Sequence, residues 1–205
     1  MDLGQLAAQV RGMMGDDPAH DFAHVMRVYG NAKELCKKED ADQTLALCAA
    51  LLHDVVSYPK LDPHSKNSAA ESAQKAVPIL QKHGLEQDEI DTIAEAIRDH
   101  SFSRGVTPRT ITGKILQDAD RLDALGAIGI ARTFATGGLL RRPLYDPDDP
   151  FCKDRDPDDS AWTVDHFFTK LLAVESGMNT QAGRAEAKRR TVFLKEFLGR
   201  LEEEL

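Results

Sequence analysis

Four residues within the first 120 positions carry side chains that bind metal ions well. They are two histidines and two aspartates, namely His24, the adjacent pair His53 and Asp54, and Asp120. One divalent transition metal could take both imidazoles and both carboxylates and still keep positions open for water or substrate. Because hydrolytic metal sites need such open positions, this set predicts a metal-dependent phosphohydrolase.

Helices should position these residues, because apolar side chains recur at intervals of three and four along most of the chain. The spacing is clearest in two groups of apolar residues: Val25, Val28, Ala32, Leu35, and Leu194, Phe197, Leu198, Leu201. Further helices are predicted over 4–14, 44–52, 67–83, 87–99, 110–136 and 163–176. Alternating strand patterns are scarce, so we predict an all-α fold built as a helical bundle.

The predicted helices give each of the four residues a place. His24 lies early in the second helix, and His53 and Asp54 follow the apolar segment 44–52, where the chain must turn toward solvent. Asp120 lies in the predicted helix 110–136, which is apolar enough to be mostly buried and which Gly137-Gly138 should end. A carboxylate on such a helix needs a partner, and a metal ion would provide one.

The charge of the chain limits its partners. The formal net charge is −8, with a pI near 5.4, which argues against a protein that grips a nucleic-acid polymer through many phosphate contacts. A small phosphorylated substrate is still compatible, because a bound cation can dominate the local field. The three cysteines form no CxxC pair and leave an odd number, so we predict no disulfide framework. Cys36 and Cys48 should be small core residues.

The chain has the length of one ordinary domain, which we place over residues 1–205. No leader peptide and no membrane-spanning stretch is recognised, so a cytoplasmic protein without a membrane partner is expected. An oligomer is possible, but no sequence feature supports one. Segment 139–161 is dense in proline and aspartate, and we expect a solvated loop there, with a lid or a partner surface as the alternative.

Two of the four ligand positions have rivals nearby. His20 precedes His24 by four residues and would share a helix face with it. His20 could therefore replace His24 as the ligand, or it could orient a ligand without binding the metal itself. Asp118 and Asp123 lie within three residues of Asp120. A single His-Asp pair is common in proteins, and only its combination with the other residues makes the pattern specific.

That combination resembles the HD superfamily of metal-dependent phosphohydrolases, in which a His, a His-Asp pair and a later Asp lie on a helical bundle. The segments HDFAHVMRV, AALLHD, DHSFSRG, ILQDADRLDALGAIGIARTFATGG and DHFFTKLL look like the small bacterial YedJ/YpgQ group. The resemblance covers nearly the whole chain. It implies that His24, His53, Asp54 and Asp120 bind the metal, and it favours His24 over His20 and Asp120 over Asp118.

The same resemblance implies a nucleotide pyrophosphohydrolase that converts an NTP or dNTP to the monophosphate and pyrophosphate. A phosphomonoesterase or 5'-nucleotidase using the same metal is the alternative, and a nucleotide-binding module without turnover is a third possibility. The cofactor would be one divalent ion, with Mn, Co, Ni, Fe or Zn suited to the His/carboxylate set and Mg possible.

Cationic residues near the motifs could bind the phosphates. The candidates are Arg27, Lys60, His100, Arg104 and Arg121. His100 leads, because an imidazole in DHSFSRG could donate to a phosphate oxygen or protonate a leaving oxygen, with a helix cap as the alternative role. Asp54 and His100 are therefore the predicted catalytic residues, with Arg27, Lys60, His100 and Arg121 as the predicted substrate-binding residues.

Overall fold

The structure is a computed structural model that describes residues 1–14, 21–58, 62–101 and 105–205. Every regular element in these ranges is a helix, which confirms the all-α prediction. The chain divides into two compact units, residues 1–120 with 179–183, and residues 121–178 with 184–205. Each unit is described by itself.

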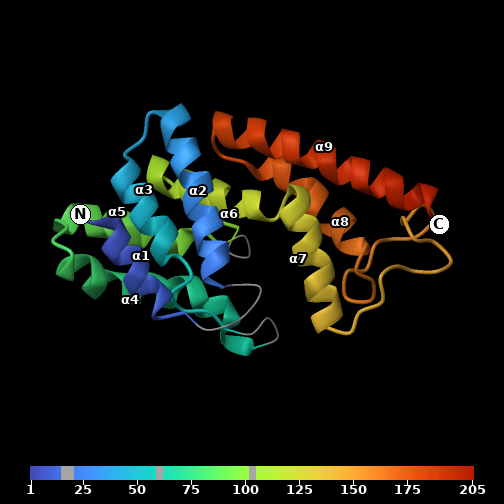
Figure 1. The fold of residues 1–205 in the computed structure, drawn as a ribbon, viewed down its shortest axis with the longest axis horizontal. Helices are drawn as coiled ribbons and strands as arrows, with labels where there is room; N and C mark the ends of the chain where they lie inside the picture. The colour runs from blue at the N-terminus through green and yellow to red at the C-terminus, as the bar shows by residue number, and fades with distance from the viewer. Residues whose placement is uncertain (15–20, 59–61, 102–104) are drawn as a thin grey trace. The chain divides into compact units, whose positions relative to one another are not determined.

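The first unit is built around one apolar helix. Helix α3, Gln43–Leu52, is buried at seven consecutive residues from Ala46 to Leu52, as expected for a helix that is apolar on all sides. It packs against α1 (Leu3–Arg11), α2 (Phe22–Glu39), α4 (Ser68–Lys82) and α5 (Gln87–Asp99), while α6 (Ile111–Asp123) follows α5 in the chain (Figure 1). The short 3-10 helix η1, Pro63–Asn67, leads into α4.

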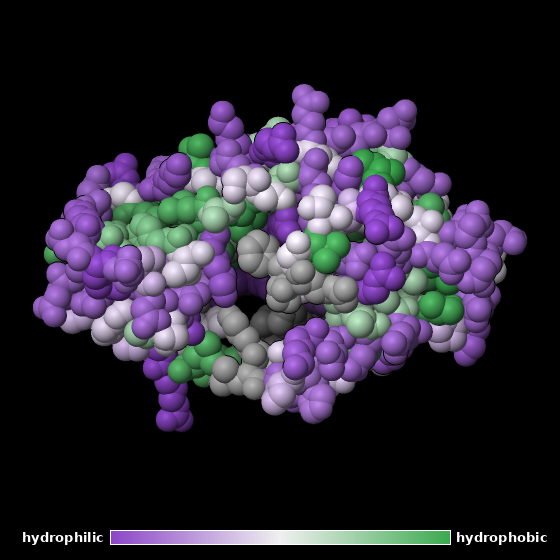
Figure 2. All heavy atoms as spheres, turned by 180° about the vertical axis from the view of Figure 1, so that it is seen from behind, coloured by the Kyte–Doolittle hydropathy of each residue, from purple (hydrophilic) through white to green (hydrophobic). Residues whose placement is uncertain are grey.

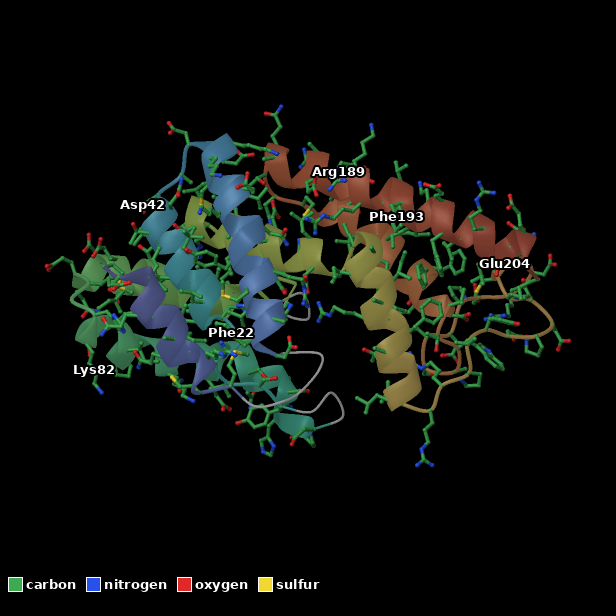
Figure 3. All side chains as sticks on the ribbon, in the orientation of Figure 1. Phe22, Asp42, Lys82, Arg189, Phe193 and Glu204 are labelled. Atoms are coloured by element: carbon green, nitrogen blue, oxygen red, sulfur yellow. The ribbon has the colours of Figure 1, made fainter. Side chains whose placement is uncertain are left out.

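Aspartate caps set where two of these helices begin. The Asp21 side chain accepts from the His24 backbone N–H at 2.8 Å, and Asp42, labelled in Figure 3, accepts from Thr44 and Leu45. Each cap satisfies N–H groups that the first helical turn would leave unpaired, which contributes about 1 kcal/mol. The Asp21 cap thereby fixes His24 in the first turn of α2.

The second unit gathers its aromatic residues into one cluster. Its helices are α7 (Gly126–Leu139), α8 (Asp165–Thr169), the 3-10 helix η3 (Leu171–Gly177) and most of α9 (Gln181–Glu203). The rings of Phe134, Phe167 and Phe197 lie 5.8 to 6.1 Å apart, centroid to centroid. Leu194 and Leu198 are also buried, which confirms the apolar spacing predicted for the last helix.

Two predicted helices are wrong in extent. The expected helix 110–136 is two helices, because Leu125 is extended and Gly126 takes a left-handed φ of 67°, so Gly137-Gly138 do not end the helix that carries Asp120. The expected helix 163–176 is the short α8 followed by η3, because Lys170 leaves helical geometry at φ −135°. Apolar spacing continues across both breaks, since the residues on each side are buried.

The segment between α7 and α8 is organised by one arginine. The Arg155 guanidinium donates to both carboxylate oxygens of the buried Asp165 and to the Asp149 carbonyl, and it forms an ion pair with Asp146. The Asp149 carboxylate in turn accepts from two backbone N–H groups, those of residues 153 and 154. Charged residues of the predicted loop, together with Asp165 of α8, therefore hold this segment in shape.

Surface and core follow the sequence prediction in several places. Cys36 and Cys48 are buried, and burial raises the pKa of their thiols to about 11 and about 12, respectively.

The surface of the molecule is mostly hydrophilic on the face that Figure 2 shows. Apolar residues on this face gather mainly at the left of the view. None of the helices in the described ranges is both long and apolar enough to cross a membrane.

Candidate metal centre

His53 stands at the end of the apolar helix α3 with its ring fixed from behind. The residue caps the C-terminus of α3 in helical geometry and is fully buried. Its Nδ1 lies 2.8 Å from the carbonyl oxygen of Ala50. Because a carbonyl oxygen can only accept, Nδ1 carries the proton, and the neutral ring presents an unprotonated Nε2. This is the tautomer that a metal-binding histidine needs.

His24 reaches the same point from α2. The side chain is buried, and its Nε2 lies 3.3 Å from the Nε2 of His53, with the ring centroids 5.3 Å apart. An unprotonated ring nitrogen presents a lone pair, so two such nitrogens at this separation can face one cation. The pair can therefore ligate one ion together.

Two carboxylates complete the group. Asp54 Oδ2 lies 3.6 Å from His24 Nε2 and 3.5 Å from His53 Nε2, and Asp120 Oδ1 lies 3.5 Å from His24 Nε2. Around an ion with ligand distances of 2.0 to 2.2 Å, neighbouring ligand atoms are roughly 3.0 to 3.6 Å apart. The observed separations fall in that range, so the donor set and its spacing fit a divalent transition metal.

His100 faces this group from α5. It caps the C-terminus of that helix, is 5% exposed, and its Nδ1 lies 2.6 Å from the Ile97 carbonyl oxygen. Its Nε2 lies 3.8 Å from Asp54 Oδ1, and its ring meets the His53 ring edge-on at 5.0 Å. Burial, followed by the neighbouring His53, holds the pKa of His100 below its ordinary value, although Asp54 and Asp120 oppose the shift. The neutral ring is therefore favoured at neutral pH.

The neighbours of Asp120 have other partners. Asp118 is fully buried, and its carboxylate accepts from the backbone N–H and side-chain amide of Asn179 and from the backbone N–H and hydroxyl of Thr180, all at 2.7 to 2.8 Å. Asp123 accepts from Arg132 at 2.6 Å within the second unit. These bonds occupy both carboxylates, which favours Asp120 as the fourth ligand.

The predicted substrate-binding residues are brought together only in part. Arg27 follows His24 by one turn of α2 and is half-buried, so it shares a helix face with that histidine. Arg121 belongs to the second unit, where Nη1 donates to the Gly177 carbonyl. Lys60, Arg104 and the rival ligand His20 lie outside the described residues. The phosphate-binding roles of these residues stay predictions.

Sequence reasoning missed the residues that hold the turn after Asp54. The buried Ser72 hydroxyl accepts from the Val56 N–H at 3.0 Å and donates to the Val56 carbonyl at 3.2 Å. The Tyr58 hydroxyl donates to Glu71 at 2.6 Å, and Lys75 donates to the Val55 carbonyl. Helix α4 therefore fixes the chain just beyond the His-Asp pair. A serine in an amphipathic helix gives no signal of such a role.

Comparison with known proteins places the chain in a family. Residues 21–125 match the HD domain family. YpgQ of Bacillus subtilis is 34% identical over 206 residues, which cover 98% of this chain and 92% of YpgQ. The crystal structure of that protein in complex with ADP matches with a TM-score of 0.76 and 32% identity, covering 99% of this chain and 94% of the other.

A crystal structure of an HD-superfamily hydrolase from Bacillus thuringiensis matches similarly. Its TM-score is 0.77 at 32% identity, and the match covers 98% of this chain and 95% of that one. These likenesses extend over nearly the full length of both proteins, and the family match includes all of the residues that form the metal centre. The chain therefore belongs to the HD domain family.

Proposed function

We propose that this protein is a metal-dependent phosphohydrolase that converts a nucleoside or deoxynucleoside triphosphate to the monophosphate and pyrophosphate. The observation that carries the proposal is the convergence of His24, His53, Asp54 and Asp120, with nitrogen and oxygen atoms 3.3 to 3.6 Å apart. Nothing in a helical core requires two imidazoles and two carboxylates to face one another, and burying them without a partner would be costly.

These four residues would hold one divalent ion. Two imidazoles with two carboxylates suit Mn, Fe, Co, Ni or Zn better than Ca, which prefers an all-oxygen shell. When bound, the ion would supply an acidified water and offset the negative charge that develops on phosphorus. The tautomer of His53 is already set for ligation, because the Ala50 carbonyl keeps the proton on Nδ1.

His100 would handle a proton beside the reacting phosphate. In the neutral ring, the Ile97 carbonyl keeps the proton on Nδ1, so Nε2 is an acceptor that faces the Asp54 carboxylate. After Nε2 takes a proton, the Asp54 carboxylate stabilises the cation, and Nε2–H can donate to a phosphate or leaving oxygen. Burial keeps this site dry enough for such bonds to be strong.

The nucleotide as substrate rests on the family relationship. YpgQ, a relative over the full length, was crystallised with ADP, so a nucleoside with a chain of phosphates is the substrate class we assign here. Arg27, one turn after His24 on α2, is the described cation best placed along the chain to meet such phosphates.

Product analysis tests the proposal. The purified protein would be incubated with NTPs, dNTPs and nucleoside monophosphates in Mn²⁺, Co²⁺ or Mg²⁺, and the products separated by ion-exchange chromatography. We expect monophosphate plus pyrophosphate from wild type and none from Asp54→Asn or Asp120→Asn. Asp88→Asn, which removes the same charge from an exposed position on α5, is the matched control and should retain the activity.

The alternative outcomes each identify another function. Release of nucleoside and inorganic phosphate would make the protein a nucleotidase that uses the same centre. Nucleotide binding by calorimetry without turnover under any metal would make it a binding module. Equal activity in wild type and Asp54→Asn would refute the assignment of the centre, whatever the product.

A further inference from the structure

Gln117 is a buried amide whose hydrogen-bonding groups are all engaged. The side chain is 1% exposed and lies on α6. Its Nε2 donates to the carbonyl oxygens of Asp99 at 3.1 Å and of Val106 at 3.0 Å, and its Oε1 accepts from the Asn179 side chain at 2.9 Å. Because a primary amide has two N–H donors, the two carbonyls use both of them.

The two carbonyls lie on either side of His100 in the sequence. Asp99 is the last residue of α5 and directly precedes His100, while Val106 follows it by six residues. Together with the bond from His100 Nδ1 to the Ile97 carbonyl, this holds the end of α5 at two carbonyl acceptors, those of Ile97 and Asp99. One amide therefore fastens the chain both before and after this histidine.

The same amide ties His100 to the helix that carries a metal ligand. Gln117 and Asp120 are three residues apart on α6, so they lie on neighbouring positions of one face. Asn179 holds Gln117 from the other side, and it also donates to Asp118 at 2.8 Å through its side chain and its backbone. A shift of the Gln117 side chain would therefore break its hydrogen bonds to all three partners.

We propose that Gln117 is a positioning residue that keeps His100 Nε2 directed at Asp54 and at the phosphate of the substrate. The catalytic consequence rests on the proposed function, but the positioning itself can be measured without turnover. Removing the amide would take away the donor to the buried Asp99 carbonyl and to the part-buried Val106 carbonyl, and would free the end of α5 around His100 to shift. The three hydrogen-bond partners of Gln117, which are the Asp99 and Val106 carbonyls and Asn179, are not among the four proposed metal ligands, so metal affinity should be preserved.

The variants Gln117→Glu and Gln117→Met test this. Glutamate keeps the shape and the acceptor for Asn179 but has no N–H to donate, and methionine removes both functions without adding charge. Thr180→Val is the matched control. It deletes a buried hydrogen bond to Asp118, the neighbour of Gln117 on α6, at 2.7 Å, but it removes no hydrogen bond to residue 99 or residue 106. All three variants should lower the melting temperature.

The first readout is the nitrogen-15 spectrum of the histidine rings in metal-free protein, with His100 assigned through His100→Gln. The two Gln117 variants should move or broaden the His100 ring signals and leave those of His24 and His53 in place. Thr180→Val should leave all three rings unchanged. Unchanged His100 signals in a folded Gln117 variant would overturn the proposal.

The second readout is kinetic. For a residue that orients a catalytic group, kcat should fall by about 10- to 100-fold, as for other outer partners of active-site groups. KM and the Mn²⁺ dissociation constant should stay within about threefold, and Thr180→Val should keep the wild-type kcat. A fall in metal affinity that matches the fall in kcat would show that Gln117 supports the metal ligands instead, against the proposal.

Failure of the proposed function is distinguishable from failure of this inference. If wild type hydrolyses no nucleotide, the proposed function fails, and the ring spectra alone decide whether Gln117 positions His100. If neither Gln117 variant folds, hydrogen exchange of the Gln117 side-chain amide in wild type decides. It should exchange far more slowly than the amide of Gln81, an exposed glutamine on α4, and equal rates would refute the buried bonds.

Discussion

Replacing Asp118 with asparagine should destabilise the first unit without weakening metal binding, whereas Asp120→Asn should do the reverse. The two aspartates are two positions apart on α6, which places them about 200° apart around the helix. Asp118 is fully buried and accepts four hydrogen bonds from Asn179 and Thr180. The Asp120 side chain is 27% exposed and lies 3.5 Å from His24 Nε2.

The expected cost of Asp118→Asn follows from the bonds to one oxygen. Oδ2 accepts from the Thr180 N–H at 2.8 Å and from the Thr180 hydroxyl at 2.7 Å. An amide NH₂ in that place cannot accept from the N–H, although the hydroxyl can rotate to become the acceptor. Hydrogen bonds to charged groups contribute about 1.5 to 3 kcal/mol each, so a net loss of about 3 kcal/mol is expected. For a chain of this length that lowers Tm by roughly 6 to 12 °C.

Thermal melting and metal titration separate the two effects. Circular dichroism melts in excess chelator measure stability without the contribution of bound metal, which would otherwise raise the Tm by mass action. Mn²⁺ titration followed by electron paramagnetic resonance measures affinity. Asp118→Asn should lose Tm and keep its Mn²⁺ affinity within a few-fold. Asp120→Asn should keep its Tm within a few degrees and lose more than about 100-fold in affinity, because outer partners alone cost 10- to 100-fold.

The opposite pattern would refute the reasoning. If Asp118→Asn kept its Tm and lost Mn²⁺ affinity, Asp118 would be the ligand and the bonds to Asn179 and Thr180 would be dispensable. If both variants lost affinity equally, the geometry of α6 as a whole, rather than one carboxylate, would control the centre.

Three further predictions concern the second unit. Arg155→Met leaves the buried carboxylate of Asp165 without its cationic partner, although the Asp158 N–H still donates to it, and should cost about 3 kcal/mol in urea unfolding, while an unchanged midpoint would contradict the role of Arg155. Gly126→Ala should cost about 1 to 2 kcal/mol in the same assay, because φ is 67° there; no loss would mean that the α6–α7 break can shift. Hydrogen bonding from Arg189 lowers the pKa of Glu186 to about 2, so its stabilisation is complete above pH 4.5 and is lost toward pH 2. Glu186→Gln should therefore cost about 1 kcal/mol at pH 7, after allowance for solvent screening, and progressively less as the pH falls toward 2; a loss that does not depend on pH would contradict the ion pair.

Two helices of the first unit were predictable from sequence almost to the residue. Helix α5 was placed at its observed bounds, 87–99, and the apolar run 44–52 is α3 within one residue. The α6–α7 break was missed because apolar spacing continues through it, and because Gly126 is one of several glycines in that stretch. Only the left-handed φ of Gly126 separates it from the others, and residue type alone does not reveal that conformation.

The four candidate ligands, which the structure brings together, could be chosen from the sequence, but the residues that hold them in place could not. Residue type and a family pattern mark the candidates His24, His53, Asp54 and Asp120, because histidine and aspartate are rarely found in apolar helices without a partner. Ser72 and Gln117 act on the backbone of residues that are distant in the sequence. The partner of Ser72 lies 16 positions away, and those of Gln117 lie 11 and 18 positions away. Backbone partners leave no trace in side-chain chemistry, so only coordinates reveal them.

The two helix-ending histidines of the centre share one local device. His53 and His100 each cap the C-terminus of a helix in helical geometry, and each directs Nδ1 at the carbonyl oxygen three residues earlier. A helix C-terminus has carbonyls without intrahelical partners, and the ring satisfies one of them. The bond that completes the helix thereby selects the tautomer and points Nε2 away from the helix end, toward the centre. At His53, helix capping and the proposed metal ligation therefore call for the same residue at the same position, which explains why a histidine directly after the buried helix α3 is an informative signal in this sequence.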